Sequence, residues 1–406
     1  MRPALGICMS VGLAAVLTSL ASPARAASDD PAPRTERISV APDGAGGNWH
    51  SVDPTVSADG RVVAFMSSAN NLLPGTDMPN NVFYRTAPGA PLKRVEVPGE
   101  STMAPRVSES GRHLTFSSWS ATSQTYSVHV MDLRTGRTEP VAPALAGGYR
   151  AYYGPAPLSA NGRYLAFVAR TAADENGVTR CRIMLLDRRS QRLWRAGPPT
   201  TRGCQDISLS ADGRKVAYQV GYSGPSDDDK ADIWVYDRVT GKTVQADVTH
   251  DGQPADRSAQ TPVLSADGSK VGFNSVATNL VPGTDPNGNT STSWNAFVRD
   301  LHTGKLQRYD GRSPTDVTLV SDLSADGSKL LLNTADANHV SQGLILREVP
   351  TGHEELLSPG QDGKPLTVGR AALSADESTA VFDSYYPGLV PDDNNLIGDV
   401  FVRTLR

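Results

Sequence analysis

A ten-residue motif recurs seven times along this chain of 406 residues and constrains its architecture more than any other feature. The copies begin with VSADGRVVAF at Val56, and one of the most regular is LSADGRKVAY at residues 209–218. The serines of the seven copies are separated by 51, 51, 51, 55, 59 and 50 residues; they are Ser57, Ser108, Ser159, Ser210, Ser265, Ser324 and Ser374. A regular period of roughly this length indicates a solenoid, a propeller or another repeat array.

Each repeat also contains a second stretch with the composition of β-strands. Examples are VHVMDLRTGRTEPV from Val128, IWVYDRVTGKTVQADV from Ile233 and AFVRDLHTGKLQRY from Ala296. Val, Ile, Tyr and Phe are frequent in them and Gly-containing turns interrupt them, whereas no long segment has helical periodicity. Each repeat is therefore predicted to form strand a, an Ala-Asp-Gly turn, strand b, a variable loop, strand c, a Thr-Gly turn and strand d. Four antiparallel strands make one blade of a propeller.

The seventh repeat is incomplete at the C-terminus. Its sequence stops after strand c, at VFVRTLR, residues 400–406, while RTERISV at residues 34–40 looks like a strand d without the rest of its blade. Pairing the two segments would close a ring and remove an open sheet edge, which a solenoid has no reason to do. We therefore predict an all-β, seven-bladed β-propeller with four antiparallel strands per blade, the last blade being closed by the N-terminal strand.

The motif resembles a known repeat family. The pattern [LV]-S-A-D-G-[RSK]-x-[VL]-[AG]-[FY] is similar to the bacterial PD40, or WD40-like, propeller repeat of TolB-like proteins and of propellers in prolyl-oligopeptidase-like peptidases. The resemblance covers residues 34–406 and implies the fold specifically, but it implies little about function. We expect neither the additional N-terminal domain of TolB nor an appended hydrolase, and no Gly-x-Ser-x-Gly motif occurs.

The N-terminal residues have the pattern of a secretory signal peptide. Arg2 precedes an apolar run from about Leu5 to Leu20, and Ala24-Arg25-Ala26 matches the small-x-small pattern of a cleavage site. A membrane anchor fits less well because the run is short and ends in Ser, Pro and Ala. We expect a cleaved signal peptide over residues 1–26, one propeller domain over residues 27–406, and a secreted or extracytoplasmic location in the periplasm or cell envelope.

Export would allow the two cysteines beyond the signal peptide to form a disulfide. Cys181 opens the predicted strand c of blade 3, and Cys204 lies just before strand a of blade 4, so we expect a bridge between neighbouring blades. The formal net charge of −4 gives no basic excess for nucleic-acid binding. No stretch beyond the N-terminus is long and apolar enough to span a membrane, and we expect a monomer.

The repeated motif is predicted to be a turn and not a chemical site. Asp-Gly between two apolar runs is a strong hairpin signal, and Gly adopts positive φ without the penalty of a Cβ atom. The seventh copy has Glu377 in place of this glycine. If the backbone there has positive φ, the cost is on the order of 1 kcal/mol.

The two faces of the predicted ring differ in variability. The a–b and c–d turns are short and stereotyped, and they lie on one face, which is predicted to be locally basic. The b–c loops and the d-to-a connections lie on the other, which we call the loop face; loops on a rigid scaffold commonly carry binding sites. The tentative ligand-binding residues there are aromatic, although such residues also fill gaps between blades: Trp119, Tyr152, Tyr153, Tyr222, Trp294, Tyr385 and Tyr386.

One loop suggests a cation. Asp285, Asn287 and Asn289 have the D-x-N-x-N spacing of the first ligands of calcium loops, in which oxygen atoms at alternate positions surround a hard cation. The bidentate Glu of such loops is missing, and turns stabilised by Asx side chains explain the same residues. Calcium is the one cofactor that the sequence suggests.

No catalytic constellation is evident. The histidines fall on separate blades or faces, and no pairing with a Ser or Cys nucleophile can be assigned. We therefore expect a secreted, non-catalytic, TolB-like module that recognises a protein or glycan of the cell envelope or the extracellular space through its b–c loop face. The alternative is a carbohydrate-active lyase or hydrolase with a propeller active site. Carboxylates around a metal near the axis would favour the enzyme, and exposed aromatic side chains without them would favour binding.

Overall fold

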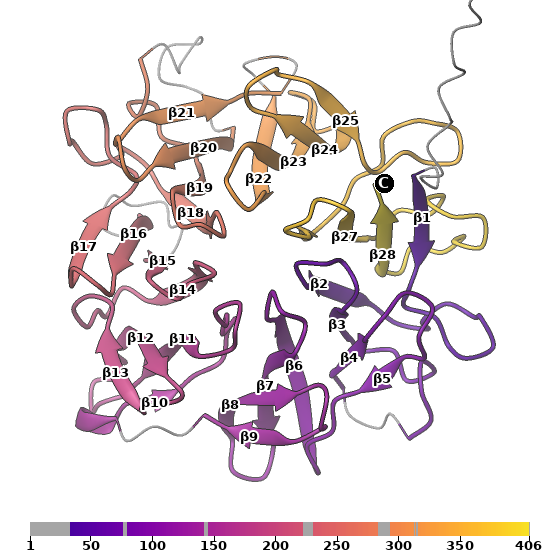
Figure 1. The fold of residues 1–406 in the computed structure, drawn as a ribbon, viewed down its shortest axis with the longest axis horizontal. Coiled ribbons are helices and arrows are strands. Elements are labelled where there is room, and N and C mark those ends of the chain that lie inside the picture. Colours follow the sequence, from indigo (N-terminus) through magenta and orange to yellow (C-terminus); the bar gives the residue numbers. More distant parts are fainter. Residues whose placement is uncertain are drawn as a thin grey trace, which may run out of the picture. The chain divides into compact units, whose positions relative to one another are not determined.

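Seven four-stranded antiparallel sheets form a ring in the computed structural model (Figure 1). It describes residues 33–75, 79–141, 145–221, 230–282, 293–311, 313 and 316–405. The predicted all-β, seven-bladed propeller is confirmed, including the order of the strands within each blade. Within the described part of the chain no helix is long and apolar enough to cross a membrane.

The strands of each blade follow the order a to d from the centre of the ring outward (Figure 1). Blade 1 consists of β2 (Ser51–Val56), β3 (Val63–Ser67), β4 (Asn81–Arg85) and β5 (Lys93–Arg94). Blade 2 consists of β6 (Glu100–Val107), β7 (His113–Ser120), β8 (Thr125–Asp132) and β9 (Thr138–Pro140). Blade 3 consists of β10 (Arg150–Ala151), β11 (Tyr164–Arg170), β12 (Cys181–Asp187) and β13 (Arg192–Arg195). Blade 4 consists of β14 (Cys204–Leu209), β15 (Lys215–Val220), β16 (Asp232–Asp237) and β17 (Lys242–Gln245).

The remaining three blades have the same arrangement. Blades 5 and 6 consist of β18 (Ala259–Leu264), β19 (Lys270–Ser275), β20 (Asn295–Asp300), β21 (Leu306–Tyr309), and β22 (Val317–Leu323), β23 (Lys329–Ala335), β24 (Ser341–Glu348), β25 (Glu354–Leu356). Blade 7 consists of β26 (Ala371–Leu373), β27 (Thr379–Ser384), β28 (Asp399–Thr404) and the first strand of the chain, β1 (Arg34–Arg37). The cores lie between adjacent blades: Phe273 of blade 5, for example, packs in one cluster with Ile233 of blade 4.

The N-terminal strand closes the ring as predicted. β1 pairs antiparallel with β28, Arg34 lying opposite Thr404 and Arg37 opposite Phe401. Figure 1 shows the indigo β1 beside the yellow β28. Because β1 supplies the outer strand of blade 7, this blade has the same four strands as the other six.

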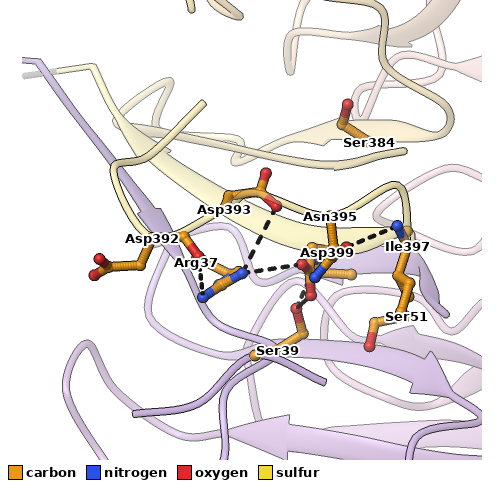
Figure 2. A network of polar contacts seen from close by, with 12 residues as sticks. Arg37, Ser39, Ser51, Ser384, Asp392, Asp393, Asn395, Ile397 and Asp399 are labelled. Atoms are coloured by element: carbon orange, nitrogen blue, oxygen red, sulfur yellow. Dashed lines mark hydrogen bonds and ion pairs between the residues drawn. The ribbon is translucent and has the colours of Figure 1, made fainter. Parts of the chain in front are cut away.

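A buried ionic network fastens this closure (Figure 2). Nη1 of Arg37 lies 3.2 Å from Oδ2 of Asp399 and 3.7 Å from Oδ1 of Asp393, and all three side chains are almost fully buried. Ser39 donates a hydrogen bond of 2.5 Å to Asp399, and Arg37 also donates to the carbonyl of Asp392. Burial, reinforced by the charge of Asp399, raises the pKa of Asp393 to about 6. One arginine from the N-terminus thus balances two carboxylates from the C-terminal blade.

We expect Arg37→Ala to destabilise the fold by about 3 to 5 kcal/mol, because it leaves two buried carboxylates without their cation. Chemical denaturation measures this loss. The penalty should shrink at mildly acidic pH, where Asp393 is protonated. Arg34→Ala, at the exposed start of the same strand, is the control and should change stability by less than about 0.5 kcal/mol. Equal losses for the two variants would contradict a role for the buried network.

The repeated motif builds a turn from its own side chains. In blade 4, Ser210 Oγ donates to Asp212 Oδ1 at 2.7 Å, and the backbone N–H groups of Arg214 and Lys215 donate to Asp212 Oδ1 and Ser210 Oγ. The turns also bind one another. Ala160 N–H donates to the Ala211 carbonyl at 2.8 Å. Backbone hydrogen bonds of this kind join the motif turns at six of the seven junctions between blades. The motif is therefore a turn, and at six of the seven junctions it also links one blade to the next.

The motif glycine serves both functions. Gly213 has φ +69°, and a Cβ atom there would lie 2.3 Å from the side chain of Tyr164 in the preceding blade. Glu377 takes this position in the seventh copy with φ 60°, as the sequence suggested it could, and its carboxylate lies 2.7 Å from Nζ of Lys329 in blade 6. Positive φ and close approach to the neighbouring blade thus explain the recurring glycine.

Gly213→Ala should cost more stability than Gly241→Ala in the same blade. Both glycines have φ near +70°, but a Cβ atom at Gly241 would meet nothing within 4 Å. We expect a loss of about 1 kcal/mol for the unfavourable φ in both variants, and a further 1 to 3 kcal/mol or so at Gly213 for overlap with Tyr164. Thermal unfolding of the two variants measures the difference. Equal melting temperatures would show that the motif glycine serves the turn alone.

Several arginines of the turn face are paired with acids of their own blades. Arg163 lies 2.7 Å from Asp187, and Arg214 lies 2.7 Å from Asp237. Each of these aspartates ends strand c of the same blade, and hydrogen bonds from Arg163 hold the pKa of Asp187 below its usual value. The charges of Arg163 and Arg214 are therefore paired within their own blades.

The two cysteines join blades 3 and 4. Cys181, the first residue of β12, and Cys204, the first residue of β14, form a disulfide with their Cα atoms 5.9 Å apart. It lies where the inner strand of blade 3 is short. β10 has two residues, since Pro155 and Pro157 follow and lack the N–H that a sheet ladder requires.

Candidate functional site

The inner strands surround a central channel of about 490 Å³. Each strand a runs from the loop face toward the motif turn, so residues that lie further before the motif serine are closer to the loop face. Four positions before that serine, the seven blades carry different side chains around the channel: Asp53, Ala104, Pro155, Asp206, Thr261, Val320 and Arg370. This ring of positions is where the repeats differ most in charge.

The backbone of these inner strands is irregular at the same positions. Asp53, Ala104, Asp206 and Thr261 all have positive φ, between 43° and 57°, although none is glycine. The pairing of the inner strand with strand b shifts register at these residues, as in a β-bulge. Left-handed residues of this kind cost free energy and persist where surrounding contacts enforce them.

Side chains of the preceding blade hold three of the inner strands, at Val320, Thr261 and Asp53, and the last two of these residues have positive φ. Asn274 on β19 accepts the N–H of Val320 and donates to its carbonyl, at 2.8 and 3.2 Å. Gln219 accepts the N–H of Thr261 in the same way. At the junction of blades 7 and 1 this position is an acid, Asp383, which accepts the N–H of Asp53 at 3.1 Å.

Around Asp53 two arginines converge from different blades. Nη1 of Arg106, in blade 2, lies 3.1 Å from both carboxylate oxygens of Asp53, and it also donates to the carbonyl of Pro105. Nε of Arg370, in blade 7, lies 3.8 Å from Asp53, and its side chain is 59% exposed. Arg106 is thus held by its partners, whereas more than half of the Arg370 side chain is exposed.

Asp383, on β27, joins this cluster through the hydrogen bond from the Asp53 N–H, and its carboxyl is largely buried. Burial raises the pKa of Asp383 to about 7, and the charge of Asp53 acts in the same direction. The hydrogen bond from the Asp53 N–H lowers the pKa but does not offset burial. The cluster therefore combines two arginines, one ionised carboxylate and one carboxyl that is neutral over much of the range below neutral pH.

One group of aromatic rings adjoins the cluster from blades 2 and 3. The ring of Tyr126 lies 4.5 Å from Trp119, 5.5 Å from Tyr152 and 5.3 Å from Tyr153, measured between centroids. The guanidinium of Arg170 lies over the ring of Tyr152, 4.8 Å from its centre. Tyr153 is 43% exposed, while Trp119 and Tyr152 are half-buried. The structure thus brings together three of the predicted aromatic residues.

A second aromatic group lies on blades 7 and 1. The ring of His50 lies 5.3 Å from Trp49 and 5.1 Å from Tyr385, and Nδ1 of His50 accepts the N–H of Gly398. Trp49 and Tyr385 remain 57% and 44% exposed. These rings precede strand a and follow strand b, so they lie on the loop face.

Charges of the ionic cluster act on one tyrosine in each aromatic group, Tyr153 and Tyr385. Burial raises the pKa of Tyr153, and the charges of Asp53 and Arg370 act on it in opposite directions. Burial and the charge of Asp383 raise the pKa of Tyr385. We call the whole arrangement, on four successive blades, the channel-mouth site: Trp49, His50, Asp53, Arg106, Trp119, Tyr126, Tyr152, Tyr153, Arg370, Asp383 and Tyr385.

The other predicted residues do not join this site. Tyr386 is exposed beside Tyr385, and Trp294 lies on blade 5, where its carbonyl accepts the N–H of Thr318. Tyr222 lies outside the described residues. So does the predicted calcium triplet of Asp285, Asn287 and Asn289. Within the described residues, no group of three or more His, Cys, Asp or Glu side chains is placed to hold a metal ion.

Two loops share the submotif N-L-[LV]-P-G-T-D, which begins at Asn71 in blade 1 and at Asn279 in blade 5, and its first residue has the same structural role in both. Asn71 donates to the carbonyl of Gly46 and accepts the N–H of Asn48, in the connection that precedes its own blade. Asn279 makes the corresponding pair of bonds with Pro254 and Asp256. The first residue of the submotif therefore holds the d-to-a connection at the loop face.

Sequence reasoning missed the charged residues of the site, and also Trp49, His50 and Tyr126. Asp53, Arg106 and Arg370 lie in or beside the strands that precede the motif, which looked purely structural, and Tyr126 lies within a strand-like stretch. A usable signal was present. Aligning the repeats on the motif serine shows Asp and Arg at channel positions where other copies have Ala, Pro, Thr or Val.

Comparison with known proteins identifies the fold. No family model and no curated protein matches the chain. Among solved structures, an oligogalacturonate lyase in complex with manganese matches with a TM-score of 0.61 and 14% identity, over 93% of this chain and 97% of that one. The oligogalacturonate lyase of Vibrio parahaemolyticus matches with a TM-score of 0.60 and 12% identity, over 93% and 98% of the two chains.

A peptidase propeller is also similar. An acylaminoacyl peptidase in complex with Z-Gly-Gly-Phe-chloromethyl ketone matches with a TM-score of 0.53 and 14% identity, over 82% of this chain and 49% of that one. This chain thus spans about half the length of the peptidase. At such identities the likeness shows the fold alone, and the propeller implied by the PD40 resemblance is confirmed at that level.

We expect the stability of the protein to fall as pH rises from about 5 to about 8, because the native state keeps the proton of Asp383 to a pKa of about 7 while an unfolded carboxyl loses it near 4. Asp383→Asn should reduce this dependence, since Asn274 and Asn333 show that an amide fits the same position. Chemical denaturation across this pH range measures the slope.

Other buried acids with raised pKa values, Asp247 and Asp322 among them, should leave part of the slope in the variant. Asp43→Asn, at an exposed turn, is the control and should leave the slope unchanged. An unchanged slope in Asp383→Asn would contradict proton retention by this carboxyl.

Proposed function

We propose that the chain is a binding module whose ligand, a glycan of the cell envelope or extracellular space, occupies the channel-mouth site. The observation that supports this most strongly is an ionic cluster whose Asp53, Arg106 and Arg370 line a channel of about 490 Å³, with two groups of aromatic rings on the same and adjacent blades. Ligand sites are typically concave, with apolar and aromatic walls and a few polar groups that fix orientation.

The chemistry of the walls favours a sugar over a flat protein surface. Aromatic rings offer broad apolar faces on which the C–H groups of a pyranose can pack, while arginine and carboxylate groups provide donors and acceptors for hydroxyl groups. The exposed rings of Trp49, Tyr153 and Tyr385 belong to blades 1, 3 and 7. An elongated ligand could therefore contact several blades at once.

An extracytoplasmic location accompanies this proposal. The N-terminal residues 1–26 have the pattern of a signal peptide. The disulfide between Cys181 and Cys204 suits a protein that folds in an oxidising compartment. Glycans and proteins of the envelope are the ligands that such a module would meet, and we expect it to act as a monomer.

One observation favours a second candidate function, a carbohydrate lyase or hydrolase. Asp53 and Asp383 are neighbouring carboxyl groups in different environments, and such pairs can divide acid and base roles between them. Asp383 is largely buried, however, and holds the backbone of Asp53, which supports a structural role. Product analysis after incubation with a bound glycan distinguishes the two functions. Cleavage that is lost in Asp53→Asn would establish the enzyme.

Tyr153→Ala should weaken glycan binding by about tenfold or more, because it removes an exposed aromatic ring of the site. A glycan array followed by calorimetry on the binders measures the effect. Val239→Ala, an exposed apolar residue on the turn face, is the matched control and should bind normally. If no glycan binds, or if Tyr153→Ala and Val239→Ala bind equally, the channel mouth is not a glycan site.

A further inference from the structure

We propose that Arg370 is an anion-binding residue of the channel-mouth site, and that the glycan bound there carries a carboxylate. The inference rests on the proposed function and specifies the chemical class of its ligand. Its basis is the unequal environment of the two arginines that flank Asp53.

The charges of the cluster do not cancel. Asp53 is the one carboxylate between Arg106 and Arg370, and Arg106 already contacts both of its oxygens. Burial keeps Asp383 in its neutral form at mildly acidic pH. The cluster then has an excess of one positive charge, in a protein whose formal net charge is −4.

The guanidinium that provides this excess is the accessible one. Arg106 and Asp53 have side-chain exposures of 22% and 17%, whereas that of Arg370 is 59%. Arg370 approaches Asp53 through Nε, 3.8 Å away, and that contact leaves its two terminal nitrogens for another partner. A guanidinium presents donors in a planar fork that matches the two oxygens of a carboxylate.

The surroundings of Arg370 suit a carboxylated sugar. Burial raises the pKa of the Tyr153 phenol and the charge of Arg370 lowers it, so the two side chains interact electrostatically across the site. Arg370 also lines the channel. We expect a uronate or sialic acid unit to place its carboxylate on Arg370 and its ring against an aromatic side chain of the site.

The same geometry makes the anion site sensitive to pH. The groups that face Asp383 are Asp53 from β2, Arg370 from the segment before β26, and Tyr385 after β27. Ionisation of Asp383 would cancel the excess positive charge and give Arg370 a competing partner within the protein. Binding of a carboxylated ligand should therefore weaken as the pH rises through neutrality.

The test compares carboxylated ligands with their own reduced forms. Hexuronate and sialic acid oligosaccharides, and the same compounds with each carboxylate reduced to an alcohol, are titrated calorimetrically into the full-length protein. We expect the reduced compounds, and Arg370→Met with the intact ones, to lose about tenfold to a hundredfold in affinity. Arg370→Lys should retain part of the affinity, and Arg134→Met, at an exposed turn on the opposite face, should retain all of it.

A second arm measures the pH dependence. Affinity for the carboxylated compounds should fall between about pH 5.5 and about pH 8, and Asp383→Asn should flatten this profile. Melting curves establish that the variants are folded. If reduced and intact compounds bind equally well, or Arg370→Met binds normally, the anion site is wrong while the glycan site stands. If no compound of either kind binds while the glycan array yields other binders, the inference fails and the proposed function stands; if no glycan binds at all, both fail.

Discussion

The pairing of β1 with β28 is the contact on which the rest of the structure depends. It joins the two ends of the chain, and the Arg37 network buries an ion pair across the same junction. Without it, β28 would be an open edge and blade 7 would lack its outer strand. Closure of the ring also places blades 7 and 1 side by side, and the Asp53–Asp383 contact exists only because these blades are neighbours.

A rigid ring allows the same position to serve different purposes in different blades. Asn274 and Gln219 hold the bulged inner strand of the next blade through amide groups. At the corresponding position Asp383 makes the same kind of bond with an ionisable group. The repeat tolerates this change because the backbone contact needs an acceptor and not a charge. Charge can therefore be introduced at one junction of the channel without altering the fold.

The fold was predictable because its signals are local and repeated. Asp212 and Gly213 encode a turn that any copy of the motif would form, and seven copies allow the blades to be counted. The site was predictable only in part. Trp119, Tyr152 and Tyr153 were assigned to the loop face, but their common partner Tyr126 was not identified. The bulge that carries Asp53 was missed as well, since side chains from another blade enforce its backbone conformation.

By itself, the sequence determined the number of blades, the order of strands, the closing role of residues 34–40 and the structural nature of the motif. Periodicity and turn chemistry encode these features within single repeats or by counting them. Only the tertiary structure decided which side chains meet at the channel mouth. Asp53, Arg106 and Arg370 come from three blades, and no local pattern records that closing the ring brings them together. Their proximity and unequal exposure leave Arg370 as the accessible cation.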